Sequence, residues 1–168
     1  EINISGERAL LVSVPSDNRY VHSFCFSQYG ERYFGSDAVA AVAVQKSDGQ
    51  TQIFRRSRGA MVEFWSVVAQ LRAHEQKRAG ESASRWGELV SQRGPEGAAR
   101  KWFFQHASQK ILNGSLTAPE VEPTRLTLDE IHARLVAGLD DENLGYRRWF
   151  YLEHGGPVSD RPQQRQAG

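Results

Sequence analysis

The spacing of the apolar residues changes near residue 57, and this change constrains the fold more than any other feature. Before it, short apolar runs end at turn residues, and residues 19–29 alternate with the two-residue period of a half-buried strand. After it, Met61, Trp65 and Val68 recur at the four- and three-residue spacing of an amphipathic helix. The chain is therefore predicted to be α+β, with β-structure first and helices after it.

Four strands are expected in the β-rich segment, residues 1–56. They cover residues 8–14, 19–29, 39–45 and 51–56. Turn-forming residues separate them, and Lys46 to Gly49 has the composition of a hairpin turn. The alanines of the third segment leave a short helix as the alternative there. We expect these strands to pair as a four-stranded antiparallel β-meander.

Four or five helices are expected to pack on this meander within residues 59–154. The predicted segments are residues 59–79, 86–90, 95–113, 128–139 and 144–154, the last with a strand as its alternative. Thr127 and Glu130 match a capping box at the start of the fourth. Residues 113–126 contain two prolines and little periodicity, which predicts a linker or a surface loop. Residues 1–154 are thus predicted to form one domain, and residues 155–168 a flexible tail.

Composition excludes several classes of protein. Apolar residues make up 39% of the chain and charged residues 24%, as in globular proteins rather than disordered ones. No apolar run is long enough to span a membrane. Cys25 is the only cysteine, which excludes an internal disulfide and a cysteine-based zinc cluster. We expect an intracellular protein without a membrane contact, with organelle import and a removed targeting peptide as the alternative.

No motif of metal or cofactor chemistry is present. The sequence lacks the paired-histidine zinc pattern, the phosphate-binding glycine loops and the nucleophile elbow. His22 and Cys25 would point to opposite faces of a strand, so they would not ligate one ion. We therefore predict no catalytic residue, no metal and no cofactor, and we favour a non-enzymatic protein. An active site assembled from distant residues is the alternative.

The central part of the chain concentrates positive charge. Residues 51–110 carry 11 basic and 5 acidic side chains, whereas the flanking segments have net charges of −2 and −3. Such asymmetry suggests an anionic partner, although solvated helix faces would also explain it. Two segments combine arginine with aromatic rings, residues 54–59 and 146–151. Arginine binds phosphates and the rings can stack on bases.

The order of a β-meander followed by a helix is similar to the half-unit of the Whirly and PUR-type single-strand-binding folds. The resemblance concerns the order of elements alone and implies that the sheet face and the basic segment after it contact single-stranded nucleic acid. Tyr20, Phe24 and Tyr33 could add stacking rings if the sheet face is open.

We therefore predict a non-enzymatic domain that binds RNA or single-stranded DNA through an arginine and aromatic surface. The alternative is a protein-interaction module, such as an adaptor, inhibitor or assembly subunit, that self-associates or binds another protein. The nucleic-acid reading requires arginines that are distant in the chain to share one surface. The predicted nucleic-acid-binding residues are Arg55, Arg56, Arg58, Arg147, Arg148, Tyr146, Trp149, Tyr20 and Tyr33.

Overall fold

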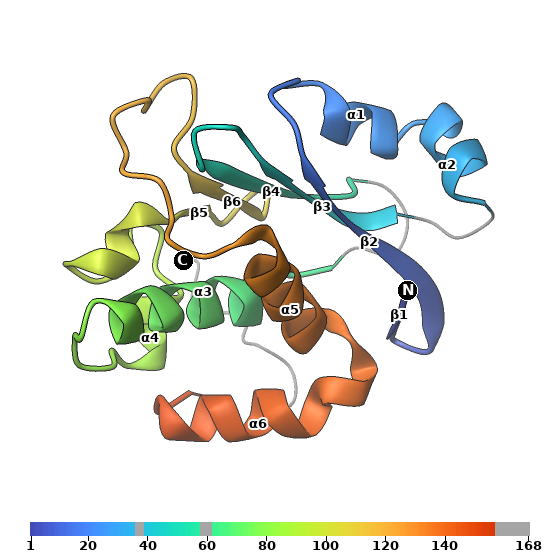
Figure 1. Cartoon of the computed structure of the whole chain (residues 1–168). Helices are drawn as coiled ribbons and strands as arrows, with labels where there is room; N and C mark the ends of the chain where they lie inside the picture. The colour runs from blue at the N-terminus through green and yellow to red at the C-terminus, as the bar shows by residue number, and fades with distance from the viewer. Residues whose placement is uncertain (36–38, 58–61, 157–168) are drawn as a thin grey trace.

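A six-stranded mixed sheet runs through the part of the chain that the structure, a computed structural model, describes: residues 1–35, 39–57 and 62–156. The strand order is β1-β2-β3-β4-β6-β5, and the neighbouring strands are antiparallel except β2 and β3, which are parallel (Figure 1). The strands are β1 (Ile2–Ile4), β2 (Glu7–Pro15), β3 (Val39–Gln45), β4 (Thr51–Arg55), β5 (Phe103–Gln105) and β6 (Lys110–Asn113).

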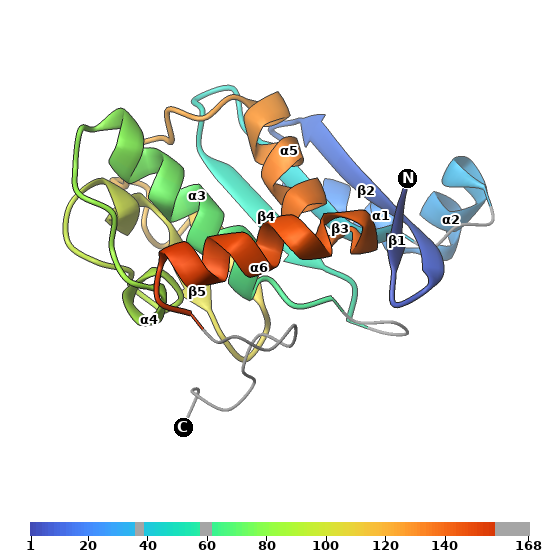
Figure 2. The ribbon, with the colours of Figure 1, turned by 90° about the horizontal axis from the view of Figure 1, so that it is seen from below.

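Helices lie on both faces of this sheet. Helices α1 and α2 cover one face, α3 and α5 cover the other, and α6 lies across α3 and α5 on the outside (Figures 1 and 2). We call these two faces the α1–α2 face and the α3–α5 face. The helices are α1 (Val21–Cys25), α2 (Gln28–Phe34), α3 (Trp65–Arg78), α4 (Trp86–Leu89), α5 (Leu128–Leu139) and α6 (Leu144–Glu153), with two 3-10 turns, η1 (Ala98–Lys101) and η2 (Asp141–Asn143). None of the described helices is long and apolar enough to cross a membrane.

The main hydrophobic core lies on the α3–α5 face. Ile53, Phe104 and Ile111 point from three strands into it and meet Leu71 of α3 and Leu135 of α5. A second, smaller cluster lies on the α1–α2 face, where Cys25 packs on β3. Helices α1 and α2 pack on β2 and β3, and His22 of α1 stacks on Phe54 at the end of β4. They leave the rest of β4 and strands β6 and β5 without a covering helix on that face.

The predicted strand over residues 19–29 is wrong, and so is the antiparallel four-stranded meander. This segment forms α1 and α2, with the Ser27 hydroxyl accepting from the backbone N–H of Gly30 at the start of α2. The two helices supply the crossover that a parallel pair such as β2 and β3 requires. Tyr20 and Phe24 alternate with smaller residues in the sequence, yet both are exposed in the structure. The sheet therefore differs from the meander on which the resemblance to Whirly and PUR-type folds was based.

The predicted helix over residues 95–113 is also wrong. This segment forms η1 and the hairpin of β5 and β6. Trp102 and Phe104 are buried whereas Phe103 and Gln105 are exposed, which is the two-residue period of a strand. The helical spacing of the aromatic residues was therefore coincidental.

Other predicted elements are confirmed. Strands β2, β3 and β4, the turn between β3 and β4, and helix α4 lie where the sequence places them. Helix α3 is confirmed over Trp65–Arg78, whereas residues 62–64 of the predicted segment are not helical. Helix α5 begins with the predicted capping box, in which the Thr127 hydroxyl accepts from the Glu130 N–H at 3.2 Å. The segment over 144–154 is helix α6 rather than the alternative strand. Strand β1 was not predicted, and the predicted tail lies largely outside the described residues.

Candidate functional site

Two adjoining hollows lie along the uncovered half of the sheet. The first, about 790 Å³, lies between the segment before α1 and the segment after β6. The second, about 550 Å³, continues toward η1 and β5. Four residues line both hollows, so together they form one continuous depression, which we call the groove. The shared residues are Gln105, Leu112, Ser115 and Thr117.

The floor of the groove consists of side chains on the α1–α2 face. The strand register places Leu112 of β6 beside Gln52 of β4 and beside Phe103 of β5. Phe54 and Lys110 follow one pleat further along. The sheet period therefore brings polar, aromatic and cationic groups from three strands onto one surface.

Positive charge dominates the lining. Among the described lining residues there is one carboxylate, Asp17, which accepts hydrogen bonds from the backbone and the hydroxyl of Ser47 at 2.9 and 3.0 Å. Cations so placed would attract an anionic ligand. The cations of the lining are Arg19, Lys46, Arg93, Arg100, Lys101 and Lys110.

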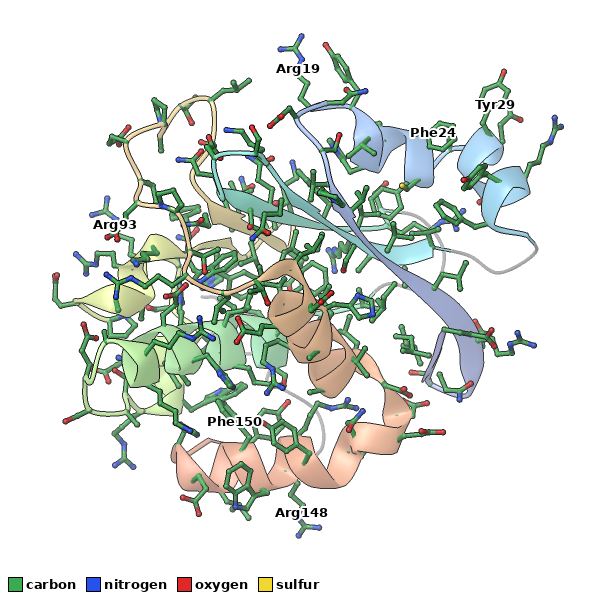
Figure 3. All side chains as sticks on the ribbon, viewed as in Figure 1. Arg19, Phe24, Tyr29, Arg93, Arg148 and Phe150 are labelled. Atoms are coloured by element: carbon green, nitrogen blue, oxygen red, sulfur yellow. The ribbon has the colours of Figure 1, made fainter. Side chains whose placement is uncertain are left out.

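Three of these cations already have carboxylate partners outside the lining. Lys46 pairs with Asp48 at 2.9 Å, Arg100 with Glu96 at 2.7 Å, and Lys101 with Glu122 at 3.4 Å. Arg19, Arg93 and Lys110 make no ion pair within the described part of the chain. Those three are the groups best able to bind an anion. Figure 3 shows Arg19 and Arg93 directed outward at separate edges of the molecule.

A ring cluster lies beside Lys110. The His22 imidazole stacks on Phe54 with ring centroids 3.9 Å apart, and the Lys110 ammonium lies 6.0 Å from the centre of the same phenyl ring. Burial, together with the positive charge of Lys110, lowers the pKa of His22. His22 is therefore neutral at pH 7 and contributes a polar ring rather than a second charge.

Exposed side chains stand on the two walls of the first hollow. Tyr20, 59% exposed, lies on one wall, where the Arg19 guanidinium covers its ring at 4.6 Å from the centroid and hydrogen-bonds its hydroxyl. Leu116, 81% exposed, lies on the other wall. Large exposed groups at the rim of a polar groove are available for contact with a ligand.

Buried amides fix the wall that carries Leu116. The Gln50 side chain donates to the carbonyl oxygens of Pro119 and Val121 at 3.1 and 2.9 Å. The Asn113 side chain donates to the carbonyl oxygen of Glu122 at 2.9 Å. Satisfied buried amides of this kind hold a loop in one conformation. The segment predicted as a linker or surface loop therefore forms a wall of the groove with a fixed conformation.

The structure does not bring the predicted arginines onto one surface. Arg56 forms an ion pair with Glu31 of α2 on the α1–α2 face. Arg147 and Arg148 belong to α6, beyond α3 and α5 on the opposite side of the sheet (Figure 1). Figure 3 shows Arg148 directed away from the molecule there. The shared arginine surface that the nucleic-acid interpretation required is therefore not formed by these residues.

Other predicted residues have structural partners or lie apart. Arg55 donates to the Val62 carbonyl at 3.1 Å, and Arg147 donates to the Asp140 carbonyl at 2.7 Å. The Tyr146 hydroxyl accepts from Arg134 at 3.3 Å.

Of the eight predicted residues that the structure describes, Tyr20 alone lines the groove. Tyr33 and Trp149 are exposed on α2 and α6 respectively. Arg58 lies outside the described residues.

Sequence reasoning missed Arg19, Arg93 and Lys110. Lys110 was assigned to the helix predicted over residues 95–113, and Arg93 lay between that helix and the one predicted over residues 86–90. The alternation of Trp102, Phe103 and Phe104 with Gln105 is the signal that could have placed Lys110 on a sheet face. No local pattern marks Arg93, because only the fold brings it beside the strands.

The cations of the groove can bind an anion. Among the described residues, no group of three His, Cys, Asp or Glu side chains could hold a metal ion. Comparison with known proteins gives no match among family models, curated proteins or solved structures. The functional interpretation therefore depends on the geometry of the groove.

Proposed function

We propose that this protein binds single-stranded nucleic acid in the groove. The observation that carries the proposal is the composition of the lining. Six cations lie among polar and aromatic groups, and the described lining residues include one carboxylate. Phosphates would contact Arg19, Arg93 and Lys110, which lack carboxylate partners within the described chain. Bases would lie over the sheet, where the ring of Phe103, 41% exposed, is available on the floor.

A single strand suits this groove better than a duplex. The aromatic groups lie on the floor and walls, and they can stack only on bases whose faces are free. Each such stacking contact contributes about 1–3 kcal/mol and tolerates any base. Ser115, Thr117 and Gln105 add hydrogen-bonding groups that can contact sugar or base edges.

The proposal predicts salt-dependent binding of short oligonucleotides. Fluorescence polarisation would measure the affinity for a labelled single-stranded 12-mer of RNA or DNA at 50 and 200 mM salt. With three phosphate contacts, we expect affinity to fall about 20-fold between these concentrations, because each contact contributes about 0.7 to the logarithmic salt slope. The same oligonucleotide annealed to its complement should bind more weakly. Absence of binding at 50 mM salt, with protein in the tens of micromolar, would reject the proposal.

A protein partner is the second candidate, because apolar side chains are exposed away from the groove. Phe24, Tyr29 and Tyr33 are exposed on α1 and α2, and Trp149 and Leu152 are exposed on α6 (Figure 3 labels Phe24 and Tyr29). Tyrosine and tryptophan are enriched among residues that dominate protein interfaces. Light scattering over a range of concentrations separates the two candidates. A constant monomer that binds oligonucleotides supports the first, and a stable oligomer that does not bind them supports the second.

A further inference from the structure

Helices α1 and α2 carry three exposed aromatic side chains that lie outside the groove. Phe24 of α1 is 45% exposed, and Tyr29 and Tyr33 of α2 are 62% and 77% exposed. Phe24 and Tyr33 are in edge-to-face contact, with ring centroids 6.3 Å apart, and Tyr29 lies one turn before Tyr33 on the same helix. We call these three side chains the helix rings. Contiguous exposed rings of this kind mark a contact surface rather than part of the core.

The helix rings begin one helical turn from the wall of the groove. Tyr20 lines the groove, and its carbonyl oxygen accepts from the backbone N–H of Phe24 at 3.1 Å. Figure 3 shows Arg19, Phe24 and Tyr29 along one edge of the molecule, from the segment before α1 to α2. A ligand that leaves the groove past Tyr20 therefore meets the helix rings next.

The charges of this segment favour an anionic ligand. Residues 16–35 include two carboxylates, and both are engaged: Asp17 in the hydrogen bonds described above, and Glu31 in an ion pair with Arg56. Arg19 and Arg32 make no ion pair within the described chain, and both are exposed. Exposed rings beside cations without carboxylate partners are the combination that binds single strands.

We propose that the helix rings form a second stacking site for the strand that lies in the groove; this inference rests on the proposed function. Bases of the strand beyond Tyr20 stack on Phe24 and Tyr33, and a phosphate of the same stretch contacts Arg32. Stacking on an aromatic face tolerates every base, so the site adds affinity without base preference. It acts only on a strand long enough to extend beyond the groove.

Substitutions of Tyr33 test this inference in the full chain. Fluorescence polarisation would measure the affinity for a labelled RNA of 18 uridines, U18, at 50 mM salt. We expect Tyr33→Ala to weaken binding of U18 about tenfold, the effect of losing one stacked base. Tyr33→Phe should bind like the wild type because it keeps the ring. Tyr33→Leu should bind like Tyr33→Ala, because leucine keeps apolar surface without an aromatic face. Wild-type affinity of either Tyr33→Ala or Tyr33→Leu would overturn the inference.

Trp149→Ala is the matched control. Trp149 is 53% exposed on α6, on the opposite side of the sheet, so its ring is accessible but remote from the strand. Its removal should change the affinity for U18 less than twofold, and an equal loss for Trp149→Ala and Tyr33→Ala would overturn the inference. The Tm of each Tyr33 variant should stay within about 2 °C of the wild type, since substitutions of exposed residues have small effects on stability.

Charge reversal in the groove distinguishes failure of this inference from failure of the proposed function. Lys110→Glu combined with Arg93→Glu should weaken binding of U18 whether or not the helix rings contribute. A loss on this reversal without any loss on Tyr33→Ala would overturn the stacking site and leave the groove proposal intact. A loss on Tyr33→Ala alone would place the strand on the helices rather than in the groove and would overturn both. Self-association that Tyr33→Ala abolishes, with U18 binding unchanged, would assign the helix rings to a protein partner and overturn the inference.

Discussion

Replacing Arg72 by methionine is expected to lower the free energy of unfolding by about 4 kcal/mol, since four backbone carbonyl groups lose a hydrogen-bond donor at about 1–3 kcal/mol each. Arg72 is 0% exposed on α3. Its guanidinium donates to the carbonyl oxygens of Trp102 at 2.6 Å, Leu89 at 2.7 Å and Gln92 at 2.8 Å, and to that of Ser91. The cost stays below the sum of these losses because methionine also relieves the buried charge.

The hydrogen bonds of Arg72 connect α3 to the whole segment between α4 and β5. Gly94 lies so close that a Cβ atom there would stand 2.7 Å from Arg72 Nε, and its φ of +73° also favours glycine. Loss of the guanidinium should therefore loosen the segment that carries Arg93. Variants at Arg72 are for this reason unsuitable for testing the groove.

Urea unfolding followed by tryptophan fluorescence would measure the effect, since the chain contains 4 tryptophans. Lys77→Met is the matched control, because Lys77 lies on the same helix and is exposed. The control should change the unfolding free energy by less than about 0.5 kcal/mol, as surface substitutions usually do. A change of under about 1 kcal/mol for Arg72→Met would show that the guanidinium does not hold this segment.

Reversing two groove charges, with Lys110→Glu and Arg93→Glu in one chain, is expected to weaken oligonucleotide binding by about 50-fold at 50 mM salt. Each phosphate contact that is lost removes about 1.2 kcal/mol of counterion release at that concentration. Both residues are exposed, and neither makes an ion pair within the described chain, so the fold should be retained. The logarithmic salt slope should also fall by about 1.4, which is two contacts at about 0.7 each.

Arg148→Glu is the control for this double variant. Arg148 is exposed on α6, on the far side of the sheet from the groove, and was itself predicted to bind nucleic acid (Figure 3). We expect its reversal to change affinity less than threefold through the general field of the protein. An equal loss for the control and the double variant would show that binding follows net charge rather than the groove.

Local sequence signals predicted the elements whose residues determine their own conformation. The turn from Lys46 to Gly49 and the Thr127 capping box are such cases, because side chains near in sequence satisfy the backbone there. Residues 19–29 and 95–113 were predicted wrongly because aromatic residues can match both periods over a short stretch. Their conformation depends on sheet partners distant in the chain, β2 with β3 and β4 with β6.

The groove could not be predicted from local patterns for a related reason. Arg19, Arg93 and Lys110 come from three separate segments, and none lies in an arginine-rich motif. The two segments that were predicted to bind nucleic acid contain Arg56, which pairs with Glu31, and Arg147, which donates to a backbone carbonyl. Arg56 and Arg147 thus make structural contacts. The cations without an ion pair in the described chain line the groove at separate places that only the fold determines.

The most direct test of the groove is the mapping of bound oligonucleotide onto the backbone by NMR. ¹⁵N-labelled protein would be titrated with an unlabelled single-stranded RNA of about ten uridines. The amide signals that should shift are those on or beside the groove floor, namely Gln52, Phe103, Gln105, Lys110 and Leu112. The amides of α6, including Arg148 and Trp149, should remain unchanged. Shifts confined to α6, or the absence of shifts on β4, β5 and β6 at saturating oligonucleotide, would contradict binding in the groove.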